Sequence, residues 1–130
     1  MKNFAFLGTA LVLVCAACSA SAHDAVQSKR HTACINKSGN TTAGMIECID
    51  IEFLRQDTRL NKAYKALMAN LPELRKEQLK QTQRIWLQYR DANCGFYNDP
   101  DGGSIARVSS NNCMLTMTAE RASELEGLQQ

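Results

Sequence analysis

The predicted fold depends on the stretch QRIWLQYRDANC, residues 83–94. It contains the only tryptophan of the chain, Trp86, and it ends on Cys94. At helical spacing, one stripe collects Thr82, Ile85, Trp86, Tyr89, Asn93 and Phe96. The pattern predicts a helix that buries its bulkiest residues against the helix before it, with Cys94 placed to link it to the segment that follows.

A long helical pattern precedes this stretch. It begins at Thr41 or Thr42, either of which can cap a helix, and its apolar positions recur at intervals of three, four and seven residues as far as Leu71. Pro72 then interrupts the pattern, because proline fits the first turn of a new helix and breaks an old one. With so short a connection, we expect the two helices to be antiparallel neighbours.

The flanking segments complete the predicted fold. Residues 23–40 are polar and without periodicity, so we expect an irregular arm, and residues 98–104 are rich in turn formers. A short third helix is expected after the polar residues 109–112, where it would cover the open side of the hairpin. The predicted fold class is all-α: one domain, residues 23–130, built from a long antiparallel helical hairpin plus a short third helix.

The first 22 residues have the features of a secretory signal. A basic start is followed by an apolar run that is too short for a membrane span and by the small-residue cleavage site Ala20-Ser21-Ala22. Ala16-Ala17-Cys18 also resembles the end of a bacterial lipobox, which would make Cys18 the lipidated N-terminus. We therefore expect a periplasmic or secreted protein, or a lipoprotein of the outer membrane or cell surface if Cys18 carries a lipid.

Four cysteines remain after this leader, namely Cys34, Cys48, Cys94 and Cys113. An even number in a small exported chain indicates two disulfides. The hairpin brings all four to one end, so geometry leaves three pairings open, while closure of the shortest loops favours Cys34–Cys48 and Cys94–Cys113. The spacings lack the close pairs typical of zinc ligands, so we predict no metal site. The formal net charge of +2 is too small for a nucleic-acid-binding protein.

Several short motifs occur in a characteristic order along the chain. They are Cys34; Thr42, Met45 and Cys48; Asp57, Leu60, Asn61 and Tyr64; Gln83, Trp86, Tyr89, Arg90, Asp91 and Cys94; Gly102, Gly103 and Ser104; Cys113; and Arg121. In order and spacing they resemble the LprI-like lysozyme-inhibitor domain of bacterial envelope proteins. The resemblance implies an exported helical domain with sequential disulfides, and a role in inhibiting lysozyme or a related peptidoglycan hydrolase.

The expected partner is accordingly a protein, bound without catalysis and without a cofactor. Glycoside hydrolysis requires two carboxylates facing each other across a cleft, which a compact hairpin does not offer. Lysozymes of the animal type are basic, so the matching surface would be the acidic beginning of the first helix or the acidic end formed by Glu120, Glu124 and Glu126. The alternative function is a periplasmic structural or adaptor module that binds another envelope protein.

The other conspicuous residues have structural interpretations. The residues assigned to the core and its polar contacts are Asp57, Leu60, Asn61, Tyr64, Trp86, Tyr89 and Arg90. Arg90 is expected to bond Asp57 or Asn61 across the hairpin, because adjacent residues of a helix point about 100° apart and Asp91 is therefore a poor partner.

The glycine-rich sequence Gly102-Gly103-Ser104 admits two interpretations. It is either a tight connection between helices or a binding loop that enters a concave site of the partner, since glycine lets backbone approach closely.

Overall fold

The computed structural model describes residues 28–129 and contains, in that range, four α-helices and no strand. They are α1 (Lys29–Lys37), α2 (Thr42–Asn70), α3 (Glu73–Phe96) and α4 (Gly103–Gly127). The predicted all-α class is confirmed. The predicted leader, residues 1–22 with Cys18, lies outside the described residues.

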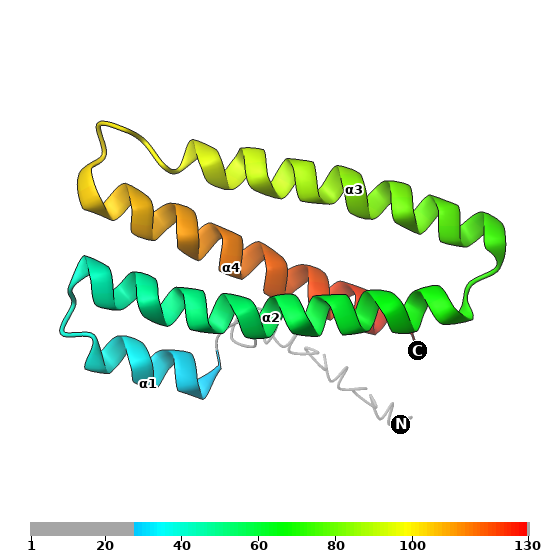
Figure 1. Cartoon of the computed structure of the whole chain (residues 1–130), viewed down its shortest axis with the longest axis horizontal. Helices are drawn as coiled ribbons and strands as arrows, with labels where there is room; N and C mark the ends of the chain where they lie inside the picture. Colours follow the sequence, from blue (N-terminus) through cyan, green and yellow to red (C-terminus); the bar gives the residue numbers. More distant parts are fainter. Residues whose placement is uncertain (1–27, 130) are drawn as a thin grey trace, which may run out of the picture.

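The hairpin of α2 and α3 has the predicted connection (Figure 1). Leu71 is extended, with φ −86° and ψ 147°, and Pro72 is the N-cap of α3. Because proline disfavours helical backbone in the residue before it, α2 ends at Asn70 and the chain reverses at once. The two helices run in opposite directions, whereas α4 runs in the same direction as α2 (Figure 1).

The last helix is longer and more central than the sequence predicted. α4 has 25 residues and begins at Gly103. The polar residues that were expected to precede it lie inside it, and one of them, Ser110, donates a hydrogen bond of 2.9 Å to the carbonyl of Cys94. α4 packs closely along α2, and α3 packs against α4 rather than against α2. The predictions of a short third helix and of a seam between α3 and the preceding helix were therefore wrong.

The core lies between α2 and α4. Leu60, Ala63 and Leu67 of α2 form one buried cluster with Ala122 and Leu125 of α4. Nearer the start of α4, Leu115 and Ala119 are also fully buried. Small side chains on both helices let their backbones approach, because the distance between packed helices depends on the residues at the contact. Leu60 is thus a core residue, as predicted.

α3 presents a different face to the core from the one predicted. Trp86 packs against the buried cluster, as does Tyr64 of α2, and both predictions are confirmed. Ile85, Tyr89 and Phe96, however, are 54%, 60% and 84% exposed, so the assignment of Tyr89 to the core was wrong. The inward face instead holds Trp86 together with Arg90 and Cys94, which are both buried.

Two arginine side chains explain why α3 turns this face towards the core. The guanidinium groups of Arg90 and Arg121 lie 5.2 Å and 5.8 Å from the centre of the Trp86 ring. Cations at such distances are attracted to the face of an indole, and the aliphatic stems of arginine cover apolar surface. A periodicity count that treats arginine as a surface residue therefore selects the wrong stripe.

The segment predicted to be an irregular arm contains α1. Ser28 caps this helix by accepting a hydrogen bond of 3.1 Å from the backbone of His31. The side chain of His31 is buried, and its Nδ1 lies 3.2 Å from the carbonyl oxygen of Cys48 on α2. The prediction was wrong because α1 has only nine residues, too few to establish a periodic pattern.

Two disulfides join neighbouring helices. Cys34–Cys48 links α1 to α2 with a Cα–Cα distance of 5.6 Å, and Cys94–Cys113 links α3 to α4 at 5.4 Å. These are the pairs favoured by closure of the shortest loops, and that prediction is confirmed. Both bonds lie towards the end of the molecule where α2 and α4 begin.

Replacing Cys94 and Cys113 together by serine should reduce the free energy of unfolding by about 3 kcal/mol, because the bond closes a short loop in the unfolded chain. Urea unfolding followed by circular dichroism measures this loss. The same titration on the Cys34→Ser/Cys48→Ser variant provides a comparison in which only α1 is released. A Cys94→Ser/Cys113→Ser variant as stable as the parent would contradict a stabilising role for the bond.

Candidate functional site

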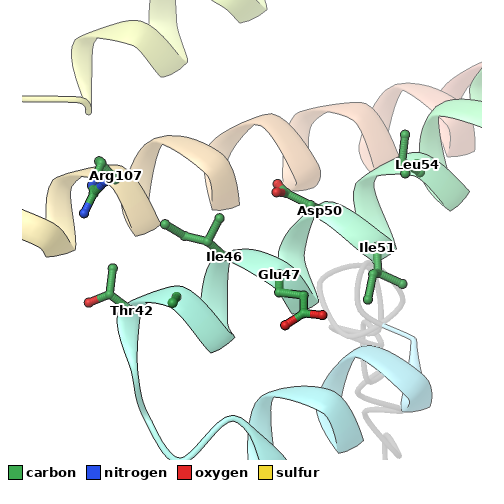
Figure 2. A pocket seen from close by; sticks show the side chains of 8 residues that line it. Thr42, Ile46, Glu47, Asp50, Ile51, Leu54 and Arg107 are labelled. Atoms are coloured by element: carbon green, nitrogen blue, oxygen red, sulfur yellow. The ribbon is translucent and has the colours of Figure 1, made fainter.

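An open groove lies on α2 and is bounded by the start of α4. Its volume is about 640 Å³, and its lining residues are Thr42, Ala43, Ile46, Glu47, Asp50, Ile51, Leu54 and Arg107. Figure 2 shows Ile46 and Asp50 on the side of α2 towards α4, and Arg107 on α4 itself. We refer to these eight residues as the α2 groove.

Apolar side chains of the α2 groove remain in contact with solvent. Ile51 is 53% exposed and Leu54 is 65% exposed. They lie on the outer face of α2, whereas Ile49 and Glu52 on its inner face are buried. Exposed apolar side chains gathered beside polar ones are typical of surfaces that bind other proteins.

Two free carboxylates give the α2 groove its charge. Glu47 and Asp50 are exposed, and neither forms an ion pair with any residue in the range 28–129. Arg107 is the cation among the lining residues. The groove therefore has a net negative charge beside an apolar surface.

The acidic residues near the C-terminus are mostly engaged within the chain. Glu124 accepts a 2.7 Å hydrogen bond from Arg121, and Glu126 accepts a 2.8 Å bond from Nε of Arg59. The hydrogen bond from Arg59 is the main reason that the pKa of Glu126 lies below its usual value. Of the two acidic surfaces that the sequence offered for a basic partner, the beginning of α2 has two carboxylates, Glu47 and Asp50, left without an ion pair by residues 28–129, whereas the other surface has only Glu120.

The loop between α3 and α4 is closed by its own hydrogen bonds. The backbone of Gly102 donates to the carbonyl of Asp99 at 3.1 Å, and the backbone of Asp101 donates to the Asp99 carboxylate at 2.9 Å. A Cβ added to Gly102 would lie 2.9 Å from that of Ala106, and Gly103 has a φ of +64°. Both glycines are therefore required by the connection itself, while Ser104 is exposed.

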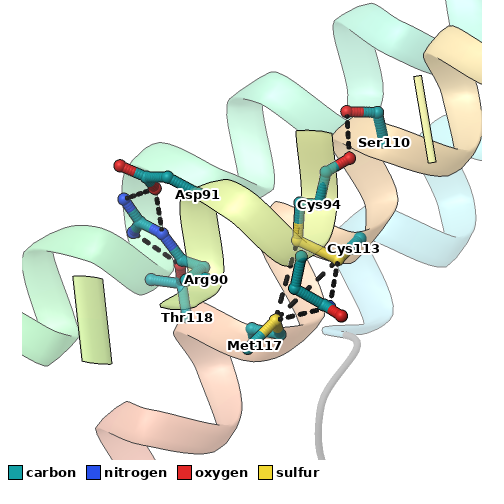
Figure 3. Close-up of a disulfide and its surroundings, with 8 residues drawn as sticks. Arg90, Asp91, Cys94, Ser110, Cys113, Met117 and Thr118 are labelled. Carbon is teal, nitrogen blue, oxygen red and sulfur yellow. Dashed lines mark hydrogen bonds and ion pairs between the residues drawn. A yellow bond between two sulfur atoms is a disulfide. The ribbon is translucent and has the colours of Figure 1, made fainter. Parts of the chain in front are cut away.

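Arg90 has different partners from those predicted. It donates to Thr118 of α4 at 3.2 Å, and its Nε and Nη2 donate to Oδ1 of Asp91 at 2.9 Å and 2.8 Å (Figure 3). Asp57 instead accepts a 3.0 Å hydrogen bond from Asn61 within α2. The predicted clamp to Asp57 or Asn61 was wrong, because the long arginine side chain reaches its neighbour and the buried hydroxyl of α4.

The Cys94–Cys113 disulfide holds this end of α3 on α4. Figure 3 shows the sulfur of Met117 facing the bond, and it lies 3.6 Å from Sγ of Cys94. Asn93 donates to the same methionine sulfur at 3.4 Å. The contacts around the bond connect α3 and α4 and indicate a structural role.

Residues 28–129 contain no group of three or more histidine, cysteine, aspartate or glutamate side chains that could hold a metal ion. No helix in this range is long and apolar enough to cross a membrane.

Comparison with known proteins gives the family. The model of a family described as "Lysozyme inhibitor LprI" matches residues 34–125. The chain belongs to the LprI lysozyme-inhibitor family. It is also similar to an uncharacterized protein of Rhizobium meliloti, with 31% identity over 97 residues that cover 62% of this chain and 68% of that protein. No solved structure matches this chain.

In this LprI-family chain, a buried polar network holds α1 against the back of the α2 groove. Glu52 is 1% exposed, and its carboxylate accepts hydrogen bonds from Ser28 at 2.7 Å, Gln56 at 2.8 Å and Arg55 at 2.9 Å. Burial acts to raise the pKa of Glu52, but the hydrogen bonds from Gln56 and Ser28, with the charge of Arg55, hold it below its usual value. Glu52 thus stays charged and links Ser28, at the start of α1, to Arg55 and Gln56 of α2.

The sequence pattern did not predict this network, because Glu52 belongs to the acidic beginning of the first helix, which the sequence offered as a surface for a basic partner. Two features of the sequence indicate the network. Ser28 stands three residues before His31, at the spacing of a helix cap, and Glu52 falls between the buried Ile49 and Gln56 on the inner stripe of α2. A carboxylate at such a position needs partners, because an unpaired buried charge is very costly.

Changing Glu52 to glutamine should lower the free energy of unfolding by about 1–3 kcal/mol near neutral pH, since Ser28 and Arg55 lose a charged acceptor. A lowered pKa in the folded state means that the stabilisation by the carboxylate is present above the usual glutamate pKa of about 4.3 and is lost as the pH falls through the folded value. Urea unfolding at a series of pH values measures both effects. The gap between parent and variant should therefore shrink in acid.

Glu120 provides the control, because it is exposed and forms no ion pair within residues 28–129. Glu120→Gln should change stability by less than about 0.5 kcal/mol at every pH. If the gap between the parent and Glu52→Gln is the same in acid as at neutral pH, the carboxylate is not the source of the stabilisation.

Proposed function

We propose that this protein binds and inhibits a lysozyme or a related peptidoglycan hydrolase, and that it does so through the α2 groove without catalysis. The observation that carries the proposal is the pair of carboxylates, Glu47 and Asp50, left unpaired by residues 28–129 beside the exposed Ile51 and Leu54. Membership of the LprI family supports the class of target.

The charges of the groove suit a basic enzyme. Lysozymes of the animal type are basic, and opposite charges on two surfaces speed their encounter and favour the correct partner. Apolar contact by Ile51 and Leu54 would then supply most of the affinity, since exposed ion pairs contribute little once formed. Inhibition should accordingly weaken as the salt concentration rises.

Bonds to α1 also fix α2 on the side of the helix opposite the groove. Cys48 and Glu52 lie on α2 between groove residues and fix that helix to α1 through a disulfide and the hydrogen bond to Ser28. A preformed surface loses less conformational entropy on binding, which supports tight inhibition by a small domain.

Reversing both charges, as Glu47→Lys/Asp50→Lys, should weaken inhibition about tenfold, because each exposed pair with a basic enzyme contributes roughly 0.5–1 kcal/mol and reversal adds repulsion. The measurement is clearing of a bacterial cell suspension by an animal-type lysozyme, titrated with the purified protein. Glu73→Lys/Glu77→Lys is the matched control, since it changes the net charge equally at the start of α3, away from the groove. Equal weakening by both variants would show that only the net charge matters.

Two further measurements locate the contact with the enzyme. Ser104→Trp adds bulk at the α3–α4 loop without the backbone strain that a side chain at Gly103 would cause. Inhibition should stay within about twofold of the parent, and a larger loss would move the contact to the loop that the sequence singled out. No inhibition of any lysozyme type by the parent protein would favour the adaptor function.

Export is part of the proposal, because disulfides persist in oxidising compartments such as the periplasm. We expect the leader to be removed, with cleavage after Ala22 or lipidation of Cys18. Mass spectrometry of the protein from its native host distinguishes the two products, since the second has a different N-terminus and the added mass of a lipid. A mature protein that still begins at Met1 would contradict export by this signal.

A further inference from the structure

The exposed surface of α3 is divided into a charged and an uncharged sector. On one side lie Glu73, Glu77, Lys80, Arg84 and Asp91. On another lie six exposed residues without charge, which we call the α3 seam: Gln78, Thr82, Ile85, Tyr89, Ala92 and Phe96. A stripe without charge is typical of a helix face that packs against a partner, whereas the solvent-facing side of a surface helix normally carries the charged residues.

The α3 seam has the spacing of a helix–helix contact. Its residues follow one another at alternating intervals of four and three, which is the heptad pattern that keeps one stripe facing a partner helix. Yet Ile85, Tyr89 and Phe96 are 54%, 60% and 84% exposed, so no part of residues 28–129 covers them. Figure 1 shows α3 at one edge of the molecule, where a further helix can approach it.

We propose that the α3 seam pairs with the same seam of a second copy of this chain, with the two helices antiparallel. A twofold axis at position 87 places Ile85 opposite Tyr89 of the second copy. The next layer pairs Thr82 with Ala92 of the second copy, and the outer layer pairs Gln78 with Phe96. Every residue of the seam thus meets another, which is the condition for a closed symmetric dimer.

The absence of charge in the seam favours a second copy of the chain over a basic enzyme as its partner. A seam without charges brings no like charges together when it faces itself, whereas a basic enzyme would find no carboxylate in it. The hydroxyl of Thr82 already donates to the carbonyl of Gln78 at 2.9 Å, so this layer contains no unsatisfied hydroxyl donor.

The seam is short enough that the dimer should be weak. From Gln78 to Phe96 it spans roughly 27 Å at 1.5 Å per residue. Its six residues are far fewer than the roughly 20–30 that each side of a standard interface uses, so association should be transient and depend on concentration. The seam is separate from the α2 groove, so dimerisation and inhibition can be tested independently.

Sedimentation velocity over about three decades of protein concentration should show a reversible shift from monomer to dimer. Ile85→Lys should abolish the shift, because it places an ammonium group in the central layer of both copies. Ile105→Lys is the matched control, since Ile105 on α4 is 60% exposed and lies outside the seam. Circular dichroism at low concentration should give the same helix content for all three proteins.

Mixing two monomeric variants tests the orientation. Ile85→Lys and Tyr89→Glu should each be monomeric, and an equimolar mixture should form a dimer, because only antiparallel helices place position 85 of one copy opposite position 89 of the other. A parent that stays monomeric at all concentrations would overturn the proposal, as would an Ile85→Lys variant that still dimerises. A mixture that remains monomeric would exclude the antiparallel arrangement.

Discussion

Close packing of α2 against α4 governs where the other helices can lie. The contact is made by small and branched residues, with Ala63 and Leu67 on α2 meeting Ala122 and Leu125 on α4. Because these helices approach so closely along their length, little room is left between them for a third apolar layer. α3 therefore lies mainly against α4, and it meets α2 through long side chains, as where the guanidinium of Arg90 lies 6.0 Å from the centre of the Phe53 ring.

The peripheral position of α3 accounts for its unusual contacts. Trp86 packs against the core with Arg90 and Arg121 near its ring, and Cys94 is bonded to Cys113. Leu79 and Trp86, two guanidinium groups and one disulfide thus attach α3 to the core, in place of the longer row of apolar residues that α2 uses. A helix attached along so narrow a strip keeps a large part of its surface exposed, which leaves the uncharged seam available to a partner.

The carboxylates that stabilise the fold are different from those proposed to bind the partner. Glu52, Glu124 and Glu126 form hydrogen bonds and ion pairs within the chain, where they join α1 to α2, hold Arg121 and join α2 to α4. Glu47 and Asp50 have no such partners in the described range and lie beside the exposed apolar residues of the groove. A change at the second pair should alter recognition with little effect on folding, whereas a change at Glu52 should act in the opposite way.

The helical class, the break at Pro72, the pairing of the cysteines and the family resemblance could all be read from the chain alone. These properties depend on local features, namely periodicity, proline geometry and short distances along the sequence. The inward face of α3, the central place of α4 and the pairing of the acidic residues became evident only from the packed helices. Each of these depends on long side chains reaching across helices, as Arg90 reaches Thr118 and Arg59 reaches Glu126, and on how closely two helices can approach. Spacing along a single helix contains no information about such contacts, so Tyr89 was expected inside and is found in solvent.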